Sequence, residues 1–132
     1  MSDKAFTGIG TVLKRSGSAI AKITNINGPG MSRDTVDVTS LDSTDGYREF
    51  ITGLRDGGTL TFDLMFTKTG YQAMRTDYNS DVAVAYTLEL PDADNTVITF
   101  NGLVTDMPMT IPLDDKVTVS VTVKVTGGIN IT

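Results

Sequence analysis

The 132-residue sequence contains no cysteine, no histidine and no tryptophan. Without cysteine there is no disulfide framework, and without cysteine or histidine there is no zinc site of the usual ligand types. The same absences remove the thiol nucleophile and the imidazole base, so no serine can belong to a Ser-His-Asp triad. We therefore expect neither an enzyme nor a bound cofactor or metal.

Charge is scarce as well. Charged residues make up 20% of the chain, and 16 acidic against 11 basic residues leave a net charge of −5. A surface of this sign disfavours binding to nucleic-acid phosphates, which requires Lys and Arg. The densest acidic cluster, Asp42, Asp45, Glu49 and Asp56, does not follow the spacing of a calcium-binding loop. Because no apolar run could span a bilayer or form a signal peptide, we expect no membrane partner.

The remaining pattern is mainly that of β-strands. Large apolar residues recur at alternate positions over residues 59–66, 82–90, 96–106 and 116–126. One helix is predicted over about Gly70 to Tyr78, because Thr69 and Gln72 have the spacing of a capping box with Thr69 as the N-cap. We expect a single domain over residues 1–132, with a flexible N-terminus at 1–8 and a C-terminal tail at 127–132 that is mobile until it pairs with another segment. Its fold class is mainly β, a β-sandwich or partly open β-barrel of about seven strands with one α-helix.

One stretch departs from this pattern. After the Gly28-Pro29-Gly30 turn, residues 34–39 alternate like a strand, but residues 40–57 have no period of two and are rich in Ser, Thr, Asp and Gly. A structureless connection longer than about 12–15 residues is uncommon in a compact domain and is usually functional or disordered. This long loop also carries large apolar side chains that something should bury. They are Leu41, Tyr47, Phe50, Ile51 and Leu54.

Two arrangements would bury these side chains. The spacing from Tyr47 to Leu54 is i, i+3, i+4, i+7, which fits a short helix folded back on its own domain, although Gly46 and Gly53 oppose a helix there. Alternatively, the long loop reaches out and docks its apolar and charged residues on another copy of the protein. The pattern alone does not separate the two.

Several segments of this stretch follow one another in a distinctive order. They are Asn27-Gly28-Pro29, residues 32–40, residues 45–50, Gly53-Leu54 and Asp56-Gly57-Gly58. Together they resemble the tail tube (major tail) proteins of long-tailed bacteriophages with non-contractile tails. The resemblance implies a β-sandwich or barrel with one helix, which assembles as stacked hexameric rings around a channel for DNA. It also favours a loop that reaches a neighbouring subunit.

The resemblance further implies a location and partners. The chain would be made in the host cytoplasm and incorporated into the virion, with a tail-tip initiator, a tape measure protein and a tail terminator as further partners. DNA would pass through the lumen without specific binding, which a weakly repulsive wall would help. We predict that subunit contacts involve Arg33, Asp34, Asp42, Tyr47, Arg48, Glu49, Phe50, Leu54 and Arg55.

Two other functions stay open. One is a monomeric β-sandwich recognition module for a carbohydrate or an adhesin-type partner. Such modules present exposed aromatic residues, which make up only 7% of this chain, and this function predicts that Tyr47, Tyr71, Tyr78 and Tyr86 cluster on one exposed face. The other is a tube protein like that of type VI secretion, to which the order of segments is less similar.

Overall fold

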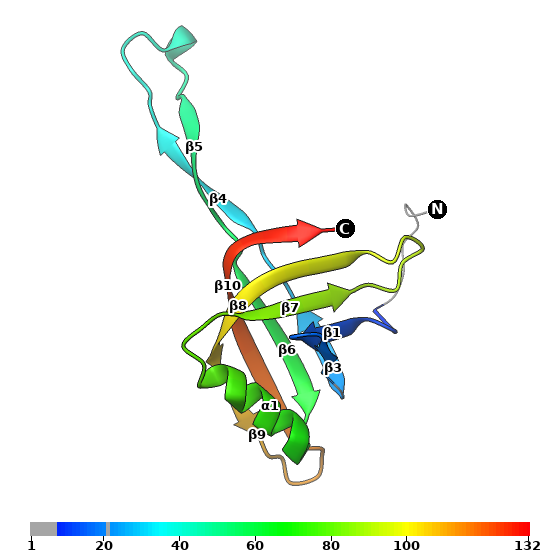
Figure 1. The fold of residues 1–132 in the computed structure, drawn as a ribbon. Helices are drawn as coiled ribbons and strands as arrows, with labels where there is room; N and C mark the ends of the chain where they lie inside the picture. Colours follow the sequence, from blue (N-terminus) through cyan, green and yellow to red (C-terminus); the bar gives the residue numbers. More distant parts are fainter. Residues whose placement is uncertain (1–7, 21) are drawn as a thin grey trace.

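The computed structural model describes residues 8–20 and 22–132, and its fold is mainly β with one α-helix (Figure 1). Eight strands form one antiparallel sheet in the order β2-β1-β7-β8-β10-β6-β3, with β9 beside β10. The sheet curls into an open half-barrel, which confirms the predicted partly open barrel. The elements are β1 (Val12–Arg15), β2 (Ser18–Ala19), β3 (Ile23–Asn27), β4 (Ser32–Asp37), η1 (Thr44–Gly46), β5 (Phe50–Asp56), β6 (Thr59–Met65), α1 (Lys68–Tyr78), β7 (Val84–Glu89), β8 (Val97–Asp106), β9 (Met109–Thr110) and β10 (Thr118–Ile131).

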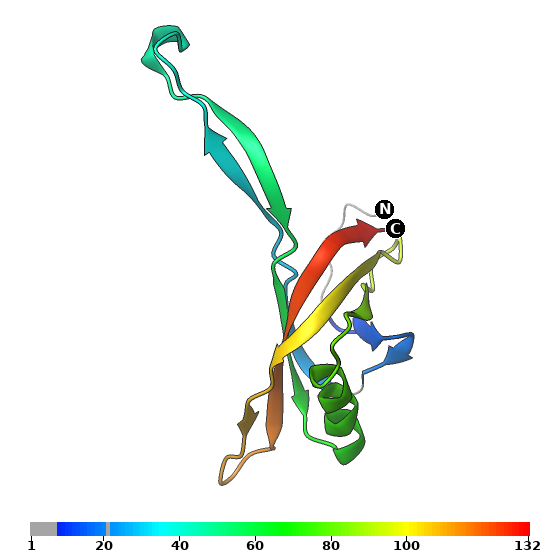
Figure 2. The same cartoon turned by 60° about the vertical axis from the view of Figure 1, so that its left-hand side comes forward.

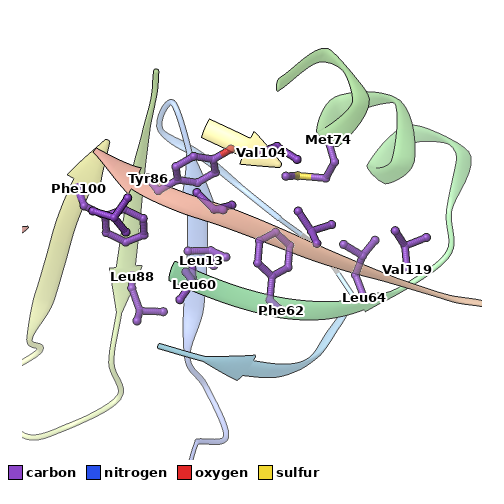
Figure 3. Packing of buried hydrophobic residues seen from close by; sticks show 13 residues of the cluster. Leu13, Leu60, Phe62, Leu64, Met74, Tyr86, Leu88, Phe100, Val104 and Val119 are labelled. Carbon is purple, nitrogen blue, oxygen red and sulfur yellow. The ribbon is translucent and has the colours of Figure 1, made fainter. Parts of the chain in front are cut away.

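The core lies on one side of this sheet, under α1 (Figure 3). Strand β6 alternates between buried Leu60, Phe62 and Leu64 and less buried polar residues. Its neighbour β10 does the same with four buried valines from Val119 to Val125. Because the two strands pair in register, these side chains form one continuous apolar layer, as their period-two pattern predicts.

The helix begins earlier than its predicted start at Gly70. Thr67, rather than Thr69, is the N-cap: its backbone is extended and its hydroxyl accepts a hydrogen bond from the N–H of Gly70 at 3.1 Å. The helix therefore covers Lys68–Tyr78 and turns Met74 into the core. The predicted capping box was wrong because Thr67 and Thr69 both precede a helical stripe, and only the cap geometry distinguishes them.

The C-terminal tail, which was predicted to be mobile until it pairs with another segment, is paired in the structure. Strand β10 continues through residues 127–131 and pairs with β8, with Asn130 opposite Thr99. Beyond it, Thr132 and Val97 exchange two backbone hydrogen bonds of 2.9 and 3.0 Å. Gly127, at φ +79°, lies at the register shift between the two paired segments. The glycines that suggested mobility instead allow the strand to bend and pair again. Of the predicted flexible N-terminus, residues 1–7 lie outside the described residues.

Strands β4 and β5 form a hairpin that projects from the body, and we call residues 31–56 the arm (Figures 1 and 2). The arm is inserted between β3 and β6, which pair directly with each other in the body. The structure corrects the predicted long loop at 40–57, because β5 occupies Phe50–Asp56 and leaves only the tip irregular. The alternative helix from Tyr47 to Leu54 is wrong, because most of that segment is strand paired with β4.

Glycines allow the arm to leave the body. Gly58 has φ +76°, and a Cβ there would lie 2.0 Å from the carbonyl oxygen of Gly30. Similarly, a Cβ on Gly57 would lie 2.5 Å from Cγ1 of Val125. The chain entering the arm at Gly30 and the chain leaving it at Gly58 therefore cross in backbone contact, which a side chain on Gly58 would prevent.

Candidate functional site

The arm buries none of its own side chains. Every residue from 31 to 56 is exposed except Ser43 and Gly53, which are half-buried. The exposed residues include large apolar ones, of which Leu54 is 84% and Tyr47 is 73% exposed. Met31, Val36, Val38, Leu41, Phe50 and Ile51 are exposed as well. So many exposed large apolar residues on one projecting segment are typical of a protein–protein contact.

The register of the hairpin distributes these side chains over both of its faces. Val36 lies opposite Ile51, so the two share one face, whereas Phe50 lies opposite Asp37 on the other face. No third strand or helix covers either face within the described residues. A two-stranded hairpin alone is marginally stable in water, and this one gains no burial from its own subunit within the described residues.

A bulge changes the direction of the hairpin near its root. Between the Arg33/Arg55 and Thr35/Thr52 pairs, β5 contains one more residue than β4. Asp34 packs against Gly53 there, where a Cβ on the glycine would lie 3.2 Å from that of Asp34. Leu54 is the neighbouring residue, and we infer that the bulge turns its side chain towards solvent.

Polar contacts hold the tip in shape. The hydroxyl of Ser43 donates to the carboxylate of Glu49 at 3.1 Å, and the N–H of Glu49 donates to the hydroxyl of Thr39 at 2.7 Å. Hydrogen bonds from the side chain and backbone of Thr39 lower the pKa of Asp37. Nη1 of Arg48 lies 4.0 Å from Oδ2 of Asp37. The tip is therefore a folded feature with a defined surface.

The root of the arm is fixed to the sheet through Asp56. Its carboxylate accepts a 2.8 Å hydrogen bond from the N–H of Gly58 and contacts Nζ of Lys124 at 3.1 Å. The Gly58 N–H, followed by the Lys124 ammonium, lowers the pKa of Asp56. Since Lys124 belongs to β10, this ion pair ties the arm to the longest strand of the body.

All of the predicted contact residues lie on the arm and are exposed. The structure places Arg33 and Arg55 opposite each other at the root, and it places Tyr47, Arg48 and Glu49 at the tip. Sequence reasoning missed Val36 as part of the same surface. The alternation of residues 34–39 is typical of a strand with one buried face, whereas Val36 is 48% exposed.

The four tyrosines do not share one exposed face. Tyr86 is fully buried, Tyr47 lies on the arm, and Tyr71 and Tyr78 lie on α1. The clustering expected of a monomeric recognition module is therefore absent from this set of residues.

Within residues 8–20 and 22–132, no group of three or more acidic side chains could hold a metal ion. None of the described helices is sufficiently long and apolar to cross a membrane.

Solved structures with this fold come from tails and injection systems. The tail of an empty gene transfer agent particle, determined with C6 symmetry, contains a chain with a TM-score of 0.78 and 19% identity, and the match covers 97% of this chain and 99% of that one. A chain from the native gene transfer agent virion has a TM-score of 0.79 at 19% identity over the same shares. A chain from the sheath/tube terminator of an extracellular contractile injection system has a TM-score of 0.76 at 10% identity, over 100% and 99% of the two chains.

Curated protein sequences gave no match. In contrast, the family model described as the lambda phage tail tube protein matches residues 6–132, which include the whole body and the whole arm. This match confirms the resemblance seen in the Gly28–Gly58 stretch and extends it to the rest of the chain. The chain belongs to the lambda phage tail tube protein family and is a structural protein of the virion tail.

Proposed function

We propose that six copies of this chain close into a ring and that the rings stack, through the arms, into a tube. The observation that carries this proposal is the arm itself, which exposes apolar side chains on both faces and has no covering layer in its own subunit. The C6 symmetry of the gene transfer agent tail, built from a chain of the same fold, supports the ring size.

The body provides the contacts within a ring. An open half-barrel leaves β2 and β3 at the two edges of its sheet, and edge strands present unpaired backbone groups to other chains. A head-to-tail contact between copies closes into a ring when its rotation permits. The curled sheet of each subunit then becomes one segment of a continuous wall.

The arm provides the contacts between rings. It extends beyond the body in one direction, so in a stack it lies along the next ring (Figures 1 and 2). There Leu54, Phe50 and Tyr47 bury their apolar surface, and Arg48 and Glu49 lie at the margin of the contact. Arg33, Asp34, Asp42 and Arg55 complete the interface that we propose.

The tube surrounds a channel through which DNA leaves the particle without specific binding. The net charge of −5 supports this role, because a chain with excess acidic residues does not attract phosphates overall. At its ends the tube would contact a tail-tip initiator and a tail terminator, and during assembly it would enclose a tape measure protein. This structural role requires no catalytic activity.

Removal of the arm tests the proposal. A variant that lacks residues 31–56 joins Gly30 to Gly57, whose flanking backbone is already in contact in the body. We expect this variant to fold, by circular dichroism, and to form no tubes by negative-stain electron microscopy in the presence of tail-tip nuclei. The wild-type chain, treated in parallel, should form tubes. Normal tubes from the folded armless variant would contradict the role of the arm, and wild-type chains that never add to nuclei would contradict the tube itself.

A further inference from the structure

A groove of about 510 Å³ lies where the arm joins the body. Its apolar lining comes from Met31 and Ile129, and Gly127 and Gly128 line it as well. Arg33 and Arg55 also line it, directly opposite each other in the hairpin register. Like charges in that position disfavour the hairpin unless an anion lies between or beside them.

The two guanidinium groups lack acidic partners within the described chain. Arg33 donates to the hydroxyl of Thr52 and to the carbonyl of Gly53, and neither arginine forms an ion pair. The third charged residue of the groove, Asp56, already forms an ion pair with Lys124 and so does not neutralise the arginines. The groove therefore combines an apolar surface with uncompensated positive charge.

The opposite end of the body carries the complementary surface. The loop between β9 and β10 lies at the far end from the arm (Figures 1 and 2). Its Leu113 is 103% exposed and Ile111 is 71% exposed, although both are large apolar residues. Asp114 and Asp115 follow immediately, and only Asp115 has a cation nearby, at 3.8 Å from Lys116.

We propose that the loop of residues 111–115 in one copy docks into the groove at the root of the arm of another copy, in the adjacent ring. Leu113 enters between Met31 and Ile129, and Asp114 pairs with Arg55 beside Arg33. The arm of one ring lies along the next ring, so its root is level with the lower edge of that ring, where the loop protrudes. This inference rests on the proposed stacking and names a second contact within it.

The natural absence of cysteine gives a direct test. The double variant Ser32→Cys/Leu113→Cys places one thiol at the groove and one on the loop between β9 and β10. The root of the arm and this loop lie at opposite ends of the body (Figure 1), so a bridge should form only between copies. After mild oxidation of assembled tubes, we expect a ladder of covalent dimers, trimers and longer oligomers on a denaturing gel. The matched control Ser32→Cys/Val82→Cys, whose second position is 73% exposed but lies elsewhere, should give no ladder.

A charge exchange tests the same contact without cysteine. Asp114→Arg alone, or Arg55→Asp alone, should raise the protein concentration needed for tube formation about tenfold, and the combination should restore it. Tubes that form without a ladder in the cysteine test would overturn the docking and leave the tube intact. A double charge exchange that fails to restore assembly would do the same. A ladder in the unassembled fraction would also contradict it, since it would place the contact outside the stack. Wild-type chains that form no tubes would instead refute the proposed function.

Discussion

Arg15, at the end of β1, binds Asp77 in the last turn of α1 through two parallel hydrogen bonds, one of them from Nε to Oδ2 at 2.7 Å and the other from Nη2 to Oδ1. Asp77 is 3% exposed, and its Oδ2 also accepts the hydroxyl of Tyr86 at 3.0 Å. The hydrogen bond with Asp77 raises the pKa of Arg15, and burial raises the pKa of Tyr86. The guanidinium therefore stays charged and the phenol neutral, and together they hold the helix on the sheet.

Removing the carboxylate should destabilise the body. Asp77→Ala leaves the part-buried guanidinium and the buried phenol without an acceptor, which should lower the free energy of unfolding by about 3 kcal/mol. Urea unfolding measures this change. Asp81→Ala, which removes an exposed acid just after the same helix, is the matched control and should change stability by less than about 0.5 kcal/mol. Equal effects of the two substitutions would show that the buried network contributes little.

The backbone crossing at the root of the arm should tolerate no side chain on Gly58. Gly58→Ala combines a left-handed backbone with a Cβ placed against the Gly30 carbonyl, so we expect a loss of about 2–4 kcal/mol in unfolding free energy. Gly30→Ala lies in the same crossing, but its Cβ would meet open space. That control should retain nearly all of the stability, measured by thermal unfolding. A wild-type melting temperature for Gly58→Ala would disprove the crossing.

The cap of α1 can be assigned by a pair of substitutions. Thr67→Ala removes the hydroxyl that accepts the Gly70 N–H, and it should cost about 1 kcal/mol of unfolding free energy. Thr69→Ala lies inside the helix, where alanine is favoured, and should be neutral or slightly stabilising. Chemical denaturation of the two variants gives the comparison. The reverse ranking would favour the capping box predicted from the sequence.

Acid should release the root of the arm. The pKa of Asp56 is lowered in the folded chain, so its contribution to stability is present above the unfolded pKa of about 3.9 and is lost as the pH falls through the folded value. Wild type should therefore be more stable than Asp56→Asn at pH 7, and the difference should shrink as the pH falls through the lowered pKa of Asp56. Melting temperatures of both proteins between pH 7 and 2.5 measure it. A difference that persists at the lowest pH would mean that charge at Asp56 is not its cause.

The exposed leucine of the arm should matter for assembly and not for folding. Leu54→Asp should leave the monomer's unfolding free energy within about 0.5 kcal/mol, because the side chain is 84% exposed. Tube formation should be lost, since a charge in the centre of an apolar contact is not compensated. Leu54→Met keeps the apolar volume and should assemble normally. Sedimentation followed by electron microscopy separates tubes from monomers, and normal tubes from Leu54→Asp would exclude this residue from the contact.

The sequence predicted the elements whose pattern is set by burial within one subunit. Valine at every second position from Val117 to Val125 predicted a strand with one buried face, and β10 has that face. The helix was predicted from its apolar stripe and its polar start. In both cases the local period reports directly which side of the element meets the core.

The arm was harder to predict because its burial is not within the subunit. Strand β5 contains adjacent Phe50 and Ile51 on opposite faces and the bulge at Gly53, so it has no clean alternation. Likewise, no local pattern pairs Arg15 with Asp77, 62 residues away. The apolar content of the loop was the signal that pointed to a partner, and the family resemblance then favoured a second copy over the chain's own domain.

The insertion of the arm between two strands that already pair has a consequence for how such tails diversify. β3 and β6 form a complete hairpin without it, and its two ends meet at Gly28–Gly30 and Gly57–Gly58. Insertions, deletions or replacement of the whole arm can therefore be selected while the fold of the body is retained. If two related tails were produced in one cell, their subunits would not mix once the arm of one no longer fitted the other, even if the subunit bodies were interchangeable.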